Sequence, residues 1–116
     1  MDFKNPYWSN KLKISALQRW IIVHSILYYE LDSSIVPDKQ FDRNAYQLVD
    51  LQKEHPTEAQ ASQYWYVFHD FDGTTGFDIY DRLTKSDKDY LTKIAKHVLH
   101  LSFADKKEGT RFGKRN

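Results

Sequence analysis

Apolar residues recur at intervals of three and four between Leu17 and Leu31, which is the spacing of one face of an α-helix. This face carries Leu17, Trp20, Ile21, His24, Leu27, Tyr28 and Leu31. Ser15 followed by Gln18 has the spacing of a capping box, a pair that begins many helices. The pattern predicts a helix over residues 16–31, with His24 as a hydrogen-bonded histidine on its buried face.

A second helix is expected after a turn. The polar residues Asp32, Ser33 and Ser34 end the first helix, and Pro37 disfavours helical backbone at Val36. Asp38 can then cap the next helix, which His55 and Pro56 end. The apolar stripe of this helix consists of Phe41, Ala45, Leu48 and Val49.

The second half of the chain predicts two further helices around a loop. Thr57 and Gln60 form another capping-box pattern, so residues 57–68 are predicted as helix, although residues 64–68 would suit a strand equally well. The sequence DFDGTTGF at residues 70–77 predicts a loop. Thr84 or Ser86 is expected to cap a last helix, whose apolar residues are Leu91, Ile94, Ala95, Val98 and Leu101.

These elements predict an all-α fold, a small single-domain bundle of about four helices with short loops. The 116 residues suffice for one such domain, which we place at residues 1–104. Residues 105–116 hold five basic and two acidic residues with two glycines, and we expect them to form a disordered basic tail. Nucleic acid contact is expected, if anywhere, only through this tail.

Composition narrows the chemistry that the chain can perform. Cysteine is absent, which excludes disulfides, iron–sulfur clusters, cysteine nucleophiles and thiolate zinc sites. No apolar run approaches the length of a membrane span, and the chain begins without a secretory apolar segment. We therefore expect a cytoplasmic protein without a membrane partner.

The segment HSILYYELDSSIVPDKQFDRNAYQLVDLQKEHP, at residues 24–56, resembles the N-terminal helical subdomain of NAD-dependent bacterial DNA ligases. That family has a Tyr-Tyr or Tyr-His pair, an aspartate three residues later, and then Ile-Pro/Ser-Asp-x-x-Tyr-Asp. Tyr28, Tyr29, Asp32, Pro37, Asp38 and Asp42 fall on this pattern without a gap. Phe41 stands where the family has tyrosine.

The resemblance implies a nucleotide site. In those ligases the subdomain closes over the nicotinamide mononucleotide half of NAD. Tyr28 and Tyr29 would accordingly offer aromatic faces to the cationic nicotinamide ring, and Asp38 and Asp42 would accept hydrogen bonds from ribose hydroxyls or the amide. The implied ligand-binding set is Tyr28, Tyr29, Asp32, Asp38, Phe41 and Asp42. Nicotinamide mononucleotide or NAD is thus a candidate ligand, but no cofactor is required.

Ligation is not expected of this chain, because ligases need the nucleophilic lysine of a Lys-x-Asp-Gly motif. The sequence has one Asp-Gly pair, Asp72-Gly73, and Asp70 stands where the lysine should be. We expect no catalytic residue and no metal site. The sequence also resembles small ligase-related proteins encoded by bacteriophages of Gram-positive hosts, a group for which no activity is implied.

Two other motifs carry alternative chemistry. The segment YWYVFHDFDGTT resembles the beginning of a haloacid-dehalogenase phosphatase, with Asp70 as nucleophile and Asp72 as acid/base around Mg²⁺. That fold needs a parallel sheet, and only 44 residues follow Asp72. His97 and His100 share a face of the last helix, but no third ligand accompanies them, so surface histidines are expected.

Aromatic residues make up 16% of the chain, more than a core of this size readily hides. We expect some to form a protein-binding surface, and the candidates are Tyr64, Trp65, Tyr66, Phe71 and Phe77. The leading hypothesis is a non-catalytic, phage-encoded binding protein on a ligase-derived scaffold, which meets a protein of DNA metabolism or defence. The alternatives are a nicotinamide-nucleotide binder that uses Tyr28, Tyr29, Asp38 and Asp42 and, more remotely, a Mg²⁺-dependent phosphatase. The same four residues would also suit a scaffold that has lost its ligand, with Asp38 as a cap and the tyrosines as packing.

Overall fold

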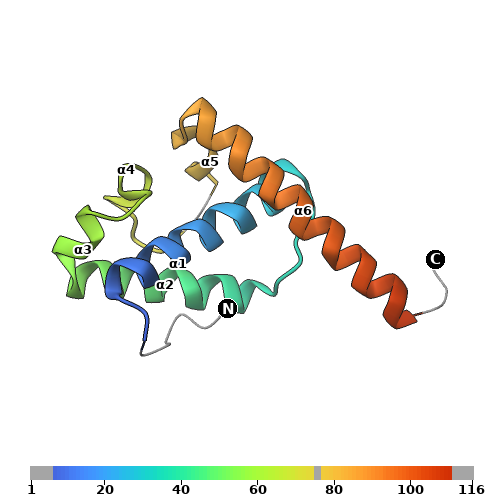
Figure 1. Cartoon of the computed structure of the whole chain (residues 1–116), viewed down its shortest axis with the longest axis horizontal. Helices are drawn as coiled ribbons and strands as arrows, with labels where there is room; N and C mark the ends of the chain where they lie inside the picture. The colour runs from blue at the N-terminus through green and yellow to red at the C-terminus, as the bar shows by residue number, and fades with distance from the viewer. Residues whose placement is uncertain (1–6, 75–76, 111–116) are drawn as a thin grey trace.

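The computed structural model describes residues 7–74 and 77–110, and its side chains through residue 102. The described residues form six α-helices and one π-helix and contain no strand, so the all-α prediction is confirmed. None of the described helices is both long enough and apolar enough to cross a membrane. Figure 1 shows α1 at the centre of the fold, with α2 beside it and α6 crossing it.

Helix α1, at Asn10–Ser25, begins six residues earlier than predicted. Its cap is Ser9, whose Oγ accepts a hydrogen bond from the Leu12 backbone N–H at 3.1 Å. The predicted capping box at Ser15 and Gln18 is therefore wrong, because both residues lie inside the helix. Gln18 lies on the buried stripe instead, together with Ile14, Leu17 and Ile21.

The helix continues as the π-helix η1, at Ile26–Glu30, where the Leu31 N–H bonds the Ile26 carbonyl at 3.0 Å. The wider π-turn carries Tyr28 and Tyr29 at the end of the predicted helix. Asp32 follows with a φ of 50°, a left-handed conformation that turns the chain. Helix α2, at Asp38–Glu54, then packs along α1, with Pro37 in the cap position and Asp38 as its first residue.

The segment predicted as one helix over residues 57–68 is broken into two. Helix α3 covers Pro56–Gln60 and α4 covers Trp65–Phe68. Between them, the Tyr64 N–H bonds the Gln18 Oε1 at 3.1 Å and the Ser62 Oγ accepts from the Gln18 Nε2 at 2.8 Å. Bonds to α1 thus replace the bonds that a continuous helix would make.

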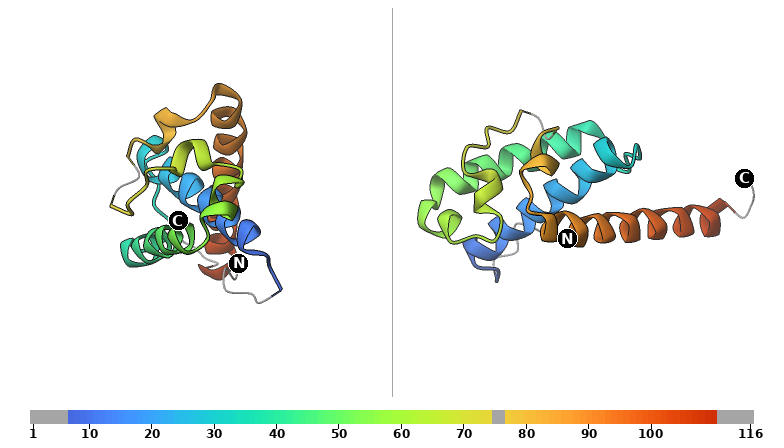
Figure 2. Two further views of the ribbon diagram at one scale, coloured as in Figure 1. Left: turned by 90° about the vertical axis from the view of Figure 1, so that its left-hand side faces the viewer. Right: turned by 90° about the horizontal axis from the view of Figure 1, so that it is seen from above.

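The last part of the chain folds back over α1. The short helix α5, at Ile79–Arg82, occupies a segment predicted to be irregular, and α6 covers Lys85–Thr110. Thr84 caps α6, as predicted, because its Oγ1 accepts from the Asp87 N–H at 3.2 Å. Figure 2 shows the far half of α6 extending beyond the other helices. The helix therefore enters the segment expected to be a tail, and residues 111–116 lie outside the described residues.

The predicted loop before α5 is confirmed where the structure describes it, at residues 70–74 and 77–78. Gly73 has a φ of 87°, and a Cβ atom placed on it would lie 2.9 Å from Cδ1 of Tyr46 on α2. The other glycine of this loop, Gly76, lies outside the described residues. Gly73 therefore fixes how closely the loop approaches α2.

Replacing Gly73 with alanine should lower the free energy of unfolding by about 1–2 kcal/mol, because alanine at positive φ is strained and its methyl group would press on Tyr46. Urea unfolding measures this change. Thr74→Ala is the control. It should lower the free energy of unfolding by only about 0.5 kcal/mol, because this substitution does not strain the backbone. Equal stability of Gly73→Ala and the wild type would refute the close approach of the loop to α2.

Candidate functional site

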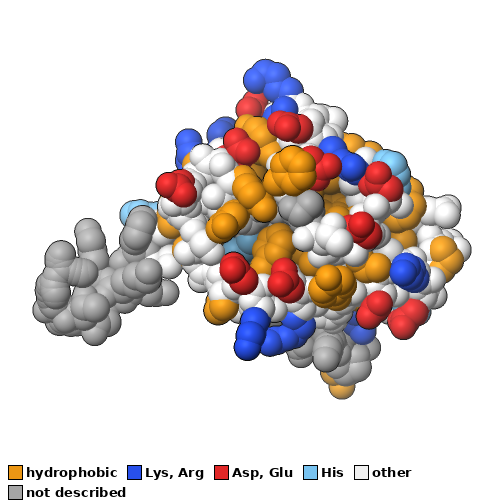
Figure 3. Space-filling model, turned by 180° about the vertical axis from the view of Figure 1, so that it is seen from behind, with side chains coloured by type: hydrophobic (Ala, Val, Ile, Leu, Met, Phe, Trp, Pro, Cys, Tyr) orange, Lys and Arg blue, Asp and Glu red, His pale blue; other side chains and the backbone are white. Residues whose placement is uncertain are grey.

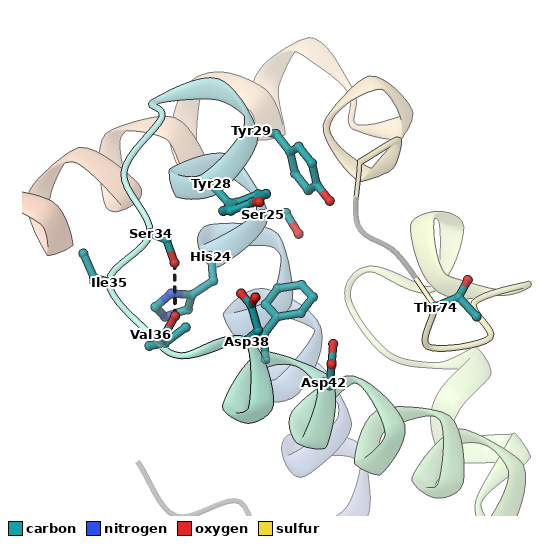
Figure 4. A pocket seen from close by; sticks show the side chains of 11 residues that line it. His24, Ser25, Tyr28, Tyr29, Ser34, Ile35, Val36, Asp38, Asp42 and Thr74 are labelled. Carbon is teal, nitrogen blue, oxygen red and sulfur yellow. Dashed lines mark hydrogen bonds between the residues drawn. The ribbon is translucent and has the colours of Figure 1, made fainter.

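A pocket of about 240 Å³ opens between η1, the turn that follows it and the beginning of α2. It is lined by His24, Ser25, Tyr28, Tyr29, Ser34, Ile35, Val36, Asp38, Phe41, Asp42 and Thr74. Figure 4 shows the tyrosines on one side and the carboxylates of Asp38 and Asp42 on the other. The volume lies just below the range of roughly 300–1,000 Å³ typical of ligand pockets, so it suits a ring with its sugar better than a whole dinucleotide.

Two aromatic rings form one wall. Tyr28 and Tyr29 are half-exposed, at 52% and 45%, and their ring centroids lie 4.7 Å apart with the planes almost perpendicular. Neither tyrosine is in the hydrophobic core, and the two rings pack edge to face on each other. Exposed ring faces attract cations and stack on flat ligands.

The opposite wall is acidic. Asp38 and Asp42 are one turn apart on α2 and therefore lie on the same face. Among the residues that the structure describes, no lysine or arginine lines the pocket. Figure 3 shows acidic and hydrophobic side chains next to each other around a hollow in this face. The described walls of the pocket therefore attract a cation or a donor of hydrogen bonds and offer no positive side chain to a phosphate.

Two buried polar residues, His24 and Ser25, complete the lining from α1. They are 9% and 2% exposed, and neither His24 Nδ1 nor Ser25 Oγ has a hydrogen-bond partner in the described part of the chain. The predicted hydrogen bond of His24 is therefore absent at Nδ1 in the described part of the chain, and its predicted burial is confirmed. Burial lowers the pKa of His24 from 6.5 to about 4, so the ring is neutral at pH 7. The ring instead contacts Trp20, with centroids 4.2 Å apart.

One lining residue comes from far along the chain. Thr74 is part of the loop that Gly73 holds against α2. Its backbone N–H and its hydroxyl donate to the same Asp72 oxygen, at 3.0 and 2.7 Å. These bonds lower the pKa of Asp72. The turn therefore holds Thr74 at the edge of the pocket.

The structure brings together five of the six ligand-binding residues predicted by resemblance, namely Tyr28, Tyr29, Asp38, Phe41 and Asp42. Asp32 does not line the pocket and instead turns the chain after η1. Sequence reasoning missed Ser25, Thr74 and the turn residues 34–36. It recognised His24 only as a core residue. The burial of Ser25 could have been predicted from its spacing, because Gln18, Ile21 and Ser25 follow one another at helical intervals on the buried face of α1.

The loop aspartates are bound to other side chains. Asp70 forms an ion pair with Arg82, whose Nη1 lies 2.5 Å from Oδ1, and this contact lowers the pKa of the carboxyl group. Asp72 accepts the two bonds from Thr74. The described residues also lack the parallel sheet of a haloacid-dehalogenase fold. The geometry therefore does not support the phosphatase alternative.

The aromatic candidates for a protein-binding surface do not form one exposed group. Tyr64 is 1% exposed and belongs to the core, so its assignment to a surface is wrong. Phe71 packs on Phe68, with centroids 5.1 Å apart, and Trp65 is partly buried. The hydroxyl group of Tyr66 donates to the Asp87 carboxylate near the beginning of α6, at 2.5 Å. Phe77 is exposed at 63%, and the protein partner stays a prediction.

Metal ligation has no support in residues 7–74 and 77–102. No group of three histidine, cysteine, aspartate or glutamate side chains that could hold an ion occurs there. His97 and His100 are exposed on α6, as expected of surface histidines.

Comparison with known protein families finds a model that matches part of the chain. Residues 9–63 match the family model described as the DNA ligase-like, N-terminal NAD⁺-binding domain. The matched segment runs from the cap of α1 to the residue before Tyr64, so it includes all the described lining residues of the pocket apart from Thr74. No curated protein and no solved structure matched the chain.

Proposed function

We propose that this chain, whose residues 9–63 match the DNA ligase-like, N-terminal NAD⁺-binding domain, binds the nicotinamide riboside part of a nicotinamide nucleotide in the pocket between η1 and α2. The observation that carries the proposal is the joint presence of Tyr28, Tyr29, Asp38 and Asp42 around that pocket. The role is binding without catalysis, because the match covers the NAD⁺-binding domain alone and Asp70 stands in place of the ligase lysine.

The charges support this ligand. The nicotinamide ring of the nucleotide is a pyridinium cation, which the faces of Tyr28 and Tyr29 attract. Asp38 and Asp42 add two negative charges and can accept hydrogen bonds from ribose hydroxyls. Phe41 adds an apolar surface to the lining of the pocket, but no hydroxyl group. A cationic ring with a sugar therefore fits both the walls and the volume of the pocket.

The phosphate group of the ligand would lie outside the pocket. No lysine or arginine is among the described lining residues, so none of these side chains would neutralise a phosphate. We therefore expect nicotinamide riboside to bind about as tightly as nicotinamide mononucleotide, within roughly threefold, a free-energy difference of about 0.7 kcal/mol. AMP should not bind, because it lacks the pyridinium ring.

Asp38→Asn should weaken the binding of nicotinamide mononucleotide at least about tenfold, because it removes one of the two charges that face the pyridinium ring. Isothermal titration calorimetry with nicotinamide mononucleotide, nicotinamide riboside, NAD and AMP measures the change. Asp50→Asn is the matched control, since Asp50 is exposed on α2 and outside the pocket. Binding that is equal in both variants, or no binding by the wild type, would refute the proposed function.

The remaining expectations concern biology beyond the pocket. A phage origin, a protein partner in DNA metabolism or defence and a cytoplasmic location follow from the sequence resemblance and composition. Each stays a prediction. Nucleotide binding is compatible with each of these three predictions, and the calorimetric test of binding does not depend on them.

A further inference from the structure

Ser25 is an unusual residue for its place in the fold. It is 2% exposed near the end of α1, and its Oγ has no hydrogen-bond partner among the described residues. A buried hydroxyl without a partner destabilises the folded chain, whereas alanine at the same helical position would favour it. His24, the preceding residue, also lines the pocket, and its Nδ1 lacks a partner as well. Two neighbouring buried polar groups therefore lack partners at one pocket.

Both groups are placed to meet a ligand. Figure 4 shows the Ser25 hydroxyl directed toward the space between the two tyrosines and Asp38, and the His24 ring beside the turn at residues 34–36. The other polar side chains that line the pocket are more exposed, so these two form its deepest polar part. A flat ring held against the tyrosines would bring its polar substituent near this part.

We propose that Ser25, with His24 beside it, recognises the carboxamide group of nicotinamide and makes the pocket select the amide over the deamidated carboxylate. This inference rests on the proposed function and assigns a specificity-determining role to Ser25. A carboxamide both donates and accepts hydrogen bonds, as do a hydroxyl group and a neutral imidazole. A carboxylate only accepts them.

The negative charges of the pocket also favour the amide over the carboxylate. Asp38 and Asp42 repel a carboxylate, and no lysine or arginine among the described lining residues compensates for their charge. Burial keeps His24 neutral at pH 7, so its ring provides no positive charge either. Nicotinic acid mononucleotide should therefore bind more weakly than nicotinamide mononucleotide, by about tenfold or more.

The test is calorimetric titration of the wild type and Ser25→Ala with nicotinamide mononucleotide and nicotinic acid mononucleotide. Ser25→Ala should lose about three- to tenfold in affinity for the amide and little for the acid, so the preference shrinks. The same variant without ligand should melt at a higher temperature than the wild type, because an unpartnered hydroxyl is removed. Ser86→Ala, an exposed position on α6, should change neither quantity.

The outcomes separate this inference from the proposed function. If the wild type binds neither nucleotide, both fail. If it binds nicotinamide mononucleotide and Ser25→Ala keeps the full preference for the amide, the pocket stands and the role of Ser25 is refuted. A lower melting temperature of Ser25→Ala would also refute it, since the hydroxyl would then stabilise the fold.

Discussion

Replacing Gln18 with alanine should lower the free energy of unfolding by about 3–5 kcal/mol, a large share of the stability of a small domain. Gln18 is fully buried, and its Nε2 donates to Gln52 Oε1 at 3.1 Å and to Ser62 Oγ at 2.8 Å. The variant would leave Gln52 Oε1 and the Tyr64 N–H without these partners, while Ser62 Oγ would keep only its bond to the Ala59 carbonyl. It would also open a cavity beside them. Chemical denaturation at neutral pH measures the loss.

Gln40→Ala is the control for this prediction. Gln40 is exposed on α2, so its loss should stay within about 0.5 kcal/mol. Gln18→Leu adds a second comparison, because it fills most of the volume but makes no hydrogen bond. If Gln18→Ala loses less than about 1.5 kcal/mol, or if Gln18→Leu is as stable as the wild type, the hydrogen bonds of Gln18 do not join these segments as described.

The bonds of Gln18 also explain why the two halves of the chain fold together. Gln18 and Gln52 lie on α1 and α2, inside the segment that matches the ligase-like domain, whereas Tyr64 and Phe68 follow it. Gln52 Nε2 donates to the Phe68 carbonyl at 3.2 Å. The segment after the matched domain is thus bonded to the two helices that form the pocket.

The sequence predicted the fold class and most helices because apolar spacing is a local signal. The stripes of α1, α2 and α6 repeat over many residues and remain visible whatever the chain packs against. The beginning of α1 was misplaced because Ser15 and Gln18 have capping-box spacing, although both serve tertiary contacts. Ser15 Oγ accepts from the Gln63 N–H at 3.3 Å, across 48 residues. Spacing alone does not reveal such a partner.

The break between α3 and α4 was missed for the same reason. Residues 57–68 have adequate helix propensity, but the N–H of Tyr64 is bonded to the side chain of Gln18 instead of continuing a helix. Ser62 likewise bonds to Gln18. The helix propensity of these residues is therefore outweighed by hydrogen bonds to α1, which form only in the folded chain.

The residues of the candidate site also fall into a group that the sequence predicts and a group that it does not. Tyr28, Tyr29, Asp38, Phe41 and Asp42 lie within fifteen residues, so one helix–turn–helix brings them together and a short motif was enough to predict them. Thr74 reaches the pocket only because Gly73 lets its loop approach Tyr46, a contact between distant segments. Asp32 belongs to the motif, but its positive φ gives it a role in the turn. A motif thus fixes where residues lie in the chain and leaves their individual roles to the local backbone.

Acid should destabilise the protein through His24. Its pKa is about 4 in the folded chain and 6.5 when the ring is fully solvated, as in the unfolded chain, so between these values the unfolded chain binds the proton and the folded chain does not. Stability from this group is complete above pH 6.5 and falls as the pH decreases toward 4. At about 1.4 kcal/mol per pH unit, urea unfolding should show a loss of about 2–3 kcal/mol between about pH 7.5 and 4.5.

His24→Phe should remove most of this loss, because phenylalanine keeps a ring against Trp20 but binds no proton. His97→Gln is the control, since His97 is exposed on α6, and it should leave the pH dependence unchanged. Other charged or titratable groups also lie near His24. Arg19 of α1 and Tyr90 of α6 line a second hollow that His24 shares, and Asp38 of α2 lines the main pocket. Asp70 and Asp72 have lowered pKa values, so their losses occur at lower pH. If His24→Phe loses as much stability as the wild type over the same pH interval, another group causes the acid sensitivity and His24 is not the buried neutral histidine of this pocket.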